Sequence, residues 1–220
     1  MEKRVLSMLA CVAIFTLAMS TTSKANLLVD PGSEGAVISG SGNGVGGWTF
    51  FNGGVFSTDF AHSGTNANKL AGGGGYSVPG AYQTFPASAG QQYTMTAFGL
   101  EPTVPAVNAN TWGALQITFW SGPNGTGSNL GTTDTSPGNA KVGNKVDSSS
   151  TAGVWIPLSV TATAPAGTAS IQAFDLVLDA TAQTTYFDDQ TLDLVPEPST
   201  VAMALTGLLG LVAFAKKRRV

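Results

Sequence analysis

The residues best suited to binding chemistry are tryptophans that stand beside amide side chains. Apolar and polar residues alternate through Leu115–Trp120, so a strand here would place Gln116 and Trp120 on one face, opposite an apolar face. Trp112 would extend that surface, and Gln172 offers a further amide. Sugar binding needs an apolar aromatic platform with a few polar groups beside it. The pattern predicts a ligand site at these residues, with ordinary packing of the tryptophans as the alternative.

Residues suited to catalysis are sparse. His62 is the only histidine and lies in a His-Ser-Gly turn, and no Gly-x-Ser-x-Gly nucleophile motif occurs in the chain. Only Glu34 and Glu101 are glutamates between residues 26 and 194, and this region contains no cysteine. A serine triad and a zinc cluster therefore lack their residues, and a domain of this size leaves little wall for the deep cleft that two hydrolytic carboxylates would need. The sequence predicts that the chain is not an enzyme.

Strands must position these residues. Side chains alternate with a period of two in Tyr93–Phe98, Leu115–Trp120 and Val154–Val160, which predicts strands there. Further strands are expected at Leu27–Val29, Trp48–Phe51, Val55–Phe60, Ala81–Phe85, Ile171–Leu178 and Tyr186–Leu194. Gly-rich and Pro-rich turns separate these runs, and no helical period occurs between residues 26 and 194. Many short strands in one region of this length indicate an all-β fold, a single β-sandwich.

The charge of this region excludes one class of partner. Residues 26–194 contain three lysines, no arginine and eleven carboxylates, a formal net charge of −8, whereas the whole chain has −3. Binding of nucleic acid phosphates needs clustered Lys and Arg. We therefore expect no nucleic acid partner.

The N-terminus has the pattern of a secretory signal peptide. A basic start at Met1–Arg4 precedes the apolar run Val5–Met19, and Ser23-Lys24-Ala25 offers a small-residue cleavage site. Residues 1–25 are therefore predicted to form a signal helix that signal peptidase removes. The exported domain would then span residues 26–194.

The C-terminus has the pattern of a membrane anchor. The segment Val195-Pro196-Glu197-Pro198 cannot continue a strand or a helix, because two prolines lack backbone donors. The apolar stretch 199–215 would form a helix of roughly 25 Å, which the basic residues 216–219 anchor in a membrane with the C-terminus in the cytoplasm. An ordinary tail anchor that is never cut is the alternative.

This order of parts in residues 195–220 resembles the PEP-CTERM sorting signal of Gram-negative bacteria. The resemblance implies recognition at Val195, Pro196, Glu197 and Pro198 by an exosortase, the membrane-embedded protease that cuts such tails. It also implies a transient stay in the inner membrane, followed by attachment at the cell surface or release.

Residues 26–194 also resemble a known family. The start Asn26–Glu34, the turn His62-Ser63-Gly64 and the closing run Tyr186–Leu192 follow the order found in carbohydrate-binding modules of the galactose-binding-like superfamily. The segments Gly153–Pro157 and Ala164–Thr168 fit the same order. The resemblance implies a jelly-roll β-sandwich.

Such modules often carry a structural calcium ion, and the matching residues are Glu34, Asp188 and Asp189. Adjacent residues of a strand point to opposite faces, so Asp188 and Asp189 cannot both point to solvent. A hard cation would offset the cost of burying a carboxylate. Capping of the carboxylates by backbone donors is the alternative.

These observations predict an exported, exosortase-sorted surface or extracellular protein with a non-catalytic domain. The domain would bind a polysaccharide and associate with exopolysaccharide or biofilm matrix. A structural matrix protein that uses the same sandwich without binding sugar is the alternative.

Overall fold

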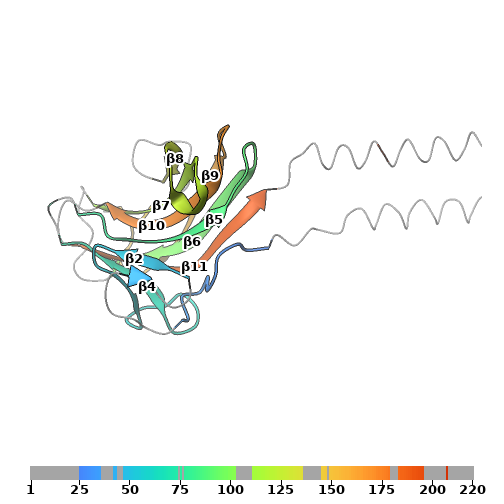
Figure 1. Ribbon diagram of the computed structural model, residues 1–220. Coiled ribbons are helices and arrows are strands. Elements are labelled where there is room, and N and C mark those ends of the chain that lie inside the picture. Colours follow the sequence, from blue (N-terminus) through green and yellow to red (C-terminus); the bar gives the residue numbers. More distant parts are fainter. Residues whose placement is uncertain are drawn as a thin grey trace, which may run out of the picture.

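The structure is a computed structural model that describes residues 25–35, 42–43, 47–73, 75, 77–102, 111–135, 145–147, 149–178, 183–195 and 207. Two antiparallel sheets pack face to face in this part of the chain (Figure 1). The predicted all-β jelly-roll sandwich is therefore confirmed.

The larger sheet has six strands in the order β1-β2-β5-β10-β7-β8. Its strands are β1 Gly42–Asn43, β2 Thr49–Phe51, β5 Gly80–Pro86, β7 Trp112–Trp120, β8 Asn129–Asp134 and β10 Ser170–Leu178. The smaller sheet has five strands in the order β3-β4-β11-β6-β9. These are β3 Gly54–Ser57, β4 Ala67–Ala71, β6 Gln92–Leu100, β9 Trp155–Thr163 and β11 Thr184–Val195. A short 3-10 turn, η1 Pro123–Gly125, follows β7.

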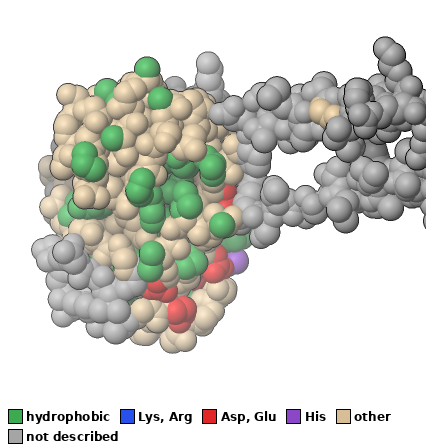
Figure 2. All heavy atoms as spheres, turned by 45° about the vertical axis from the view of Figure 1, so that its right-hand side comes forward, with side chains coloured by type: hydrophobic (Ala, Val, Ile, Leu, Met, Phe, Trp, Pro, Cys, Tyr) green, Lys and Arg blue, Asp and Glu red, His purple; other side chains and the backbone are tan. Residues whose placement is uncertain are grey.

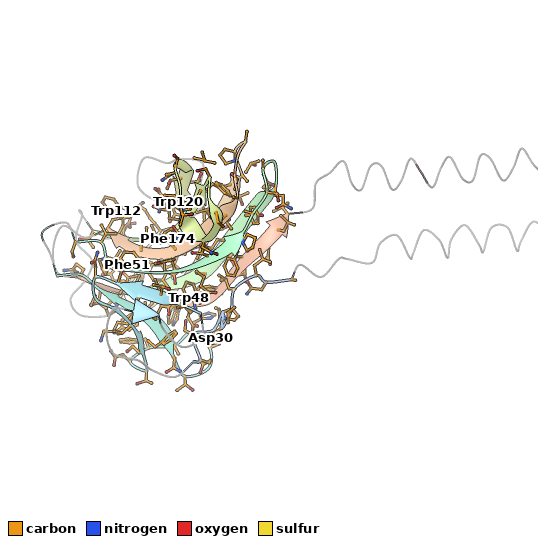
Figure 3. All side chains as sticks on the ribbon, viewed as in Figure 1. Asp30, Trp48, Phe51, Trp112, Trp120 and Phe174 are labelled. Atoms are coloured by element: carbon orange, nitrogen blue, oxygen red, sulfur yellow. The ribbon has the colours of Figure 1, made fainter. Side chains whose placement is uncertain are left out.

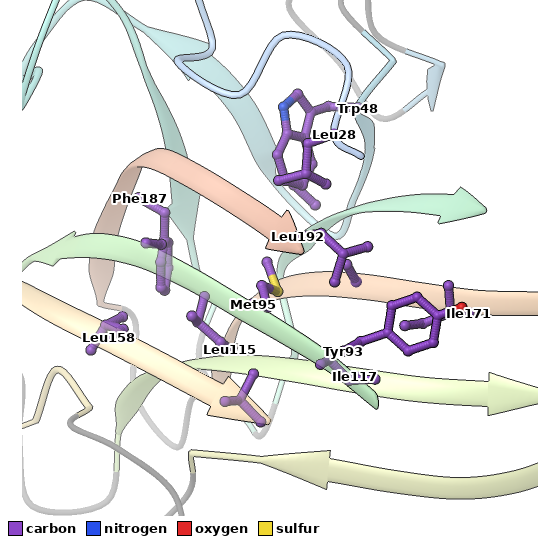
Figure 4. Packing of buried hydrophobic residues seen from close by; sticks show 14 of the residues in the cluster. Leu28, Trp48, Tyr93, Met95, Leu115, Ile117, Leu158, Ile171, Phe187 and Leu192 are labelled. Atoms are coloured by element: carbon purple, nitrogen blue, oxygen red, sulfur yellow. The ribbon is translucent and has the colours of Figure 1, made fainter. Parts of the chain in front are cut away.

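The alternation seen in the sequence decides which side chains fill the core. In β6, Tyr93, Met95 and Ala97 are buried, whereas the residues between them are half-buried on the outer side. The same period of two buries Leu115 and Ile117 on the facing sheet, and the two sets meet between the sheets (Figure 4). Removing this apolar area from water is the main source of the stability of such a sandwich.

The first described residues run beside the last strand. The Asn26 side chain donates to the Gln190 carbonyl and accepts from the Leu192 N–H, both at 2.9 Å, and Leu27 N–H donates to Leu192 O at 2.9 Å. Both ends of the sandwich therefore lie at one side of the domain (Figure 1).

The predicted strand Leu27–Val29 is wrong, because no strand forms there. The Gln83 side chain takes the place of a strand partner. Its Oε1 accepts from Val29 N–H at 2.9 Å, and its Nε2 donates to Val29 O at 2.7 Å. One side chain thus satisfies the backbone groups that a ladder would otherwise pair.

Strands β1, β4 and β8 were not predicted. Their sequences lack apolar alternation: β4 carries the polar Asn68 at a fully buried position, and β8 is rich in glycine, threonine and asparagine. These strands form because neighbouring strands offer hydrogen-bonding edges, which is a tertiary effect.

No helix in the described part of the chain is long and apolar enough to cross a membrane. Apart from Ala25 and Gly207, the predicted signal helix and the predicted transmembrane segment lie outside the described residues.

Candidate functional site

The four residues predicted as a ligand site share the outer face of the six-stranded sheet, which we call the aromatic face. Trp112, Gln116 and Trp120 lie at alternate positions of β7, and the β10 register places Gln172 opposite Thr118. Trp112, Gln116 and Trp120 are half-buried. Neither tryptophan is therefore fully enclosed, and both sugar binding and ordinary packing by these residues stay predictions.

The two tryptophans mark the ends of β7. Eight residues separate them, so about 27 Å of strand lies between their Cα atoms. The Nε1 atoms of both indoles are buried and have no hydrogen-bond partner among the described residues. In contrast, Trp48 is fully buried, and its Nε1 donates to Asp30 O at 3.0 Å (Figure 3).

Three aromatic rings that sequence reasoning missed lie between these ends. Phe51 from β2, Tyr82 from β5 and Phe174 from β10 come together, with ring centroids 5.2 to 6.5 Å apart. We call them the aromatic triad. All three are half-buried and sit at outward positions of strands whose alternate residues are buried. The alternation can be read from the sequence and predicts outward-pointing rings. The sequence does not show that β2, β5 and β10 are neighbours in the sheet.

Gly80 makes the triad's close packing feasible. A Cβ atom at this position would meet the Phe51 Cζ atom and would lie 2.8 Å from the Leu176 Cδ2 atom. The Phe51 ring therefore lies directly over the glycine backbone and beside Leu176. Any larger residue at Gly80 would displace the ring from this position.

A polar row crosses the aromatic face next to the triad. Gln172 Nε2 donates to Thr84 Oγ1 at 3.2 Å, and the hydroxyls of Thr118 and Thr132 lie 3.2 Å apart. Gln116 Nε2 donates to Thr118 Oγ1 at 3.1 Å, and its second amide hydrogen has no acceptor among the described residues. The row contains the amides and hydroxyls that a sugar-binding site needs.

The turn after β7 covers part of this row. Gly125 N–H donates to Ser170 Oγ at 3.0 Å, and Ser170 Oγ–H donates to Gly122 O at 2.6 Å. A Cβ atom at Gly125 would lie 2.5 Å from Gln172 Nε2, so the turn packs directly on this amide. Gln172 is accordingly only 9% exposed. The turn thus makes Gln172 the least accessible of the four predicted ligand residues.

The acidic residues predicted to bind calcium gather around the loop 62–66, on the other sheet. Phe187 packs in the core, so the neighbouring Asp188 points to the outer side of β11, where the loop buries it completely. Asp188 Oδ2 accepts from His62 N–H at 2.7 Å and from Ser63 N–H at 3.1 Å. Burial raises the pKa of Asp188, although these backbone donors oppose the rise.

Asp189 occupies a bulge in β11, with φ of 49°, and turns toward the same loop. His62 Nδ1 lies 2.6 Å from Asp189 Oδ2, and Ser63 Oγ–H donates to Asp189 Oδ1 at 2.6 Å. Partial burial favours a higher pKa for Asp189, but the hydrogen bonds from Ser63 and His62 outweigh it, so the pKa is lowered. The single histidine lies beside acidic side chains at the edge of the face in Figure 2.

Glu34 reaches the far end of the loop. Its Oε1 accepts from Thr65 N–H at 2.7 Å and from Asn66 N–H at 3.1 Å. In the described ranges, no group of three or more Asp, Glu, His or Cys side chains is arranged to hold a metal ion. Backbone N–H groups of the loop donate to Glu34 and Asp188. A calcium site at Glu34, Asp188 and Asp189 stays a prediction.

A buried polar network that the sequence did not predict joins the two sheets. Asp175 Oδ2 on β10 accepts from Asn68 Nδ2 at 2.9 Å and from Gln190 Nε2 at 3.0 Å. Ser33 Oγ–H donates to Asn68 Oδ1 at 3.0 Å, and all four residues are buried. Asp175 Oδ1 and Gln190 Oε1 have no partner in the described part of the chain. Burial raises the pKa of Asp175 to about 7, and the two amide donors lower it only in part.

Comparison with protein families identifies the C-terminus. Its last residues match the family model described as the PEP-CTERM protein-sorting motif. Residues 194–219 are a PEP-CTERM sorting motif. The motif marks a secreted surface protein that an exosortase processes, in agreement with the resemblance at Val195 to Pro198. Apart from its first two residues and Gly207, it lies outside the described residues.

Comparison with solved structures concerns the sandwich. The CBM22-1 xylan-binding domain of Paenibacillus barcinonensis Xyn10C is 16% identical, with 81% of this chain and 99% of that chain covered and a TM-score of 0.51. The arabinose-bound MgGH51 α-L-arabinofuranosidase is 16% identical, with 78% of this chain but 26% of that chain covered and a TM-score of 0.54. At such identities the similarity shows the fold alone. A search of curated proteins found no match.

Proposed function

We propose that this exported surface protein binds a polysaccharide, without catalysis, through the aromatic face. The observation that carries the proposal is the placement of Trp112, Gln116 and Trp120 on one half-buried face. Aromatic rings receive the C–H faces of sugars, and the neighbouring amides and hydroxyls bind their hydroxyl groups.

The fold supports the same ligand class. One structure that shares it is named a xylan-binding domain, so the scaffold is compatible with polysaccharide binding. Fold alone does not assign a ligand, and for that reason the side chains of the aromatic face carry the argument.

The carboxylates near this face support the proposal of binding without catalysis. Among the described residues of the six strands, Asp134 on β8 lies on the outer face, level with Gln116, while Asp175 is buried between the sheets. Glycoside hydrolysis by the common routes uses two carboxylates that flank the scissile bond. A single carboxylate at the edge fits a binding role.

The sorting motif supplies the location. We propose export with removal of residues 1–25 by signal peptidase, transient anchoring of segment 199–215 in the inner membrane of a Gram-negative cell, and cutting by the exosortase. The processed protein would then meet exopolysaccharide or biofilm matrix outside the cell. A structural matrix role without sugar binding is the second candidate, and it is favoured only if the aromatic face proves inert.

A glycan array with the exported protein separates the two candidates. We expect binding to at least one polysaccharide and a loss of about tenfold in affinity for Trp120→Ala, because a ring contact contributes about 1 kcal/mol or more. Trp155→Ala is the matched control, since Trp155 is a half-buried tryptophan on the other sheet. Absence of binding to every polysaccharide, or equal losses for the two variants, would reject the proposal.

A further inference from the structure

The aromatic triad is a poor platform for stacking sugar rings. The planes of Phe51 and Tyr82 are inclined by 55°, those of Phe51 and Phe174 by 87°, and those of Tyr82 and Phe174 by 38°. Stacking along a glycan chain needs ring faces that lie open to the ligand. Rings packed edge to face instead form a compact apolar patch, which suits a small apolar group better than a flat sugar face.

The aromatic face is divided into an apolar part and a polar part along its strands. Next to the triad, Leu176 lies between Gly80 and Ala114 in the register, and Leu178 lies opposite Trp112. Toward Trp120 the face changes to hydroxyls and amides. A ligand that covers both parts must therefore combine hydroxyl groups with apolar groups.

The described lysines are both paired with carboxylates. The bridge between Gly113 and Val146 places Lys145 beside the Trp112 end of β7, and its Nζ lies 2.6 Å from Asp147 Oδ2. Lys69 belongs to β4 of the other sheet, and its Nζ lies 2.5 Å from Asp59 Oδ2. No lysine or arginine is seen in the coloured part of the chain in Figure 2. The described part of the face therefore offers no unpaired cation to an acidic glycan.

We propose that the aromatic triad binds the O-acetyl groups of a polysaccharide, while the adjoining polar row binds its hydroxyls. This inference rests on the proposed function and names the substrate class of the same face. An acetyl ester joins an apolar methyl group to a carbonyl acceptor. The face offers a partner for each, because the apolar Phe174 stands directly opposite Gln116 in the register of β10 and β7.

Phe174 and Gln116 are neighbours on adjacent strands of this face. Opposed residues of an antiparallel pair have Cβ atoms about 5 Å apart. The methyl group would pack on the Phe174 ring, and the carbonyl oxygen would accept the Gln116 Nε2 hydrogen that Thr118 does not use. Removing the ester would leave both groups without these partners.

The test compares polymers that differ only in acetylation. Acetylated xylan and acetylated glucomannan are titrated into the exported protein, alongside the same two polymers after removal of their esters with alkali. We expect the acetylated form of at least one polymer to bind about fivefold tighter or more. If every polymer that binds has the same affinity with and without its acetyl esters, the inference is overturned and the proposed function still stands. Absence of binding to all four would count against both.

Variants identify the residues that cause the preference for acetylated polymers. Phe174→Ala should abolish the preference for the acetylated polymer, whereas Trp120→Ala should weaken binding to both forms equally and leave the preference in place. If Phe174→Ala does not fold, Phe51→Ala on the short strand β2 removes another ring of the triad. A preference that survives loss of the triad's rings would show that acetyl groups bind elsewhere.

Discussion

Replacing Asp175 by asparagine should remove a pH dependence from the stability of the sandwich. Asp175 is completely buried, and burial raises its pKa to about 7. Acceptors outnumber donors around it, since Asp175 Oδ1 and Gln190 Oε1 lack partners among the described residues. A proton on the carboxyl group supplies the missing donor. The charged groups around it are few: Asp188 acts on it through space, and Asn68 and Gln190 are neutral donors.

The magnitude follows from the two pKa values. The unfolded chain should titrate this carboxyl group near pH 4 and the folded protein near pH 7, a difference of about 3 units, or about 4 kcal/mol. Because the folded pKa is raised, the folded protein binds the proton more tightly than the unfolded chain. The stabilising contribution is therefore complete below pH 4 and is lost as the pH rises to 7 and above.

The assay is urea denaturation of the exported protein between pH 4 and 9, followed by tryptophan fluorescence. Asparagine has nearly the same shape as the protonated acid and cannot ionise. We expect Asp175→Asn to match the native protein near pH 4 and to exceed its free energy of unfolding by up to about 4 kcal/mol at pH 8.

Comparison of the two proteins cancels the contributions of other carboxyl groups, such as Asp189, whose lowered pKa favours stability at higher pH. Asp193→Asn, at a half-buried position on β11, is the matched control for the exchange of a carboxyl group for an amide. A stability difference between Asp175→Asn and the native protein that stays constant from pH 4 to 9 would refute the reasoning.

Two further predictions concern the loop and the aromatic face. For calcium, we expect EDTA to lower the melting temperature, added Ca²⁺ to restore it, and Glu34→Ala to remove the difference; identical melting curves would mean that hydrogen bonds alone hold the loop. For packing, Gly80→Ala should destabilise the protein by about 1 to 3 kcal/mol in urea denaturation, because the new Cβ atom meets Phe51 and Leu176. An unchanged midpoint would show that the Phe51 ring moves aside without cost.

Much of the fold was predictable because the buried strands repeat with a period of two. Strands at Tyr93–Phe98, Leu115–Trp120 and Ile171–Leu178 were expected, and the structure places β6, β7 and β10 there. Strands such as β4 and β8 were not predictable in this way, because backbone pairing holds them and their side chains carry little apolar pattern.

Only part of the candidate site could be predicted from the sequence. Trp112, Gln116 and Trp120 belong to one strand, so local alternation was enough to place them on one face. The triad joins strands β2, β5 and β10, which are distant in sequence, and its rings meet only through sheet order and register. No local pattern contains that information.

The sequence by itself determined where the protein goes and what class of domain it carries. A sorting motif is a linear signal, and the period of two is a local property, so both can be read without a fold. Tertiary structure alone decided that the carboxylates of Asp188 and Asp189 hold the loop 62–66, and that Asp175 lies between the sheets with Asn68 and Gln190. These contacts depend on long-range strand pairing, which brings together groups up to 127 residues apart.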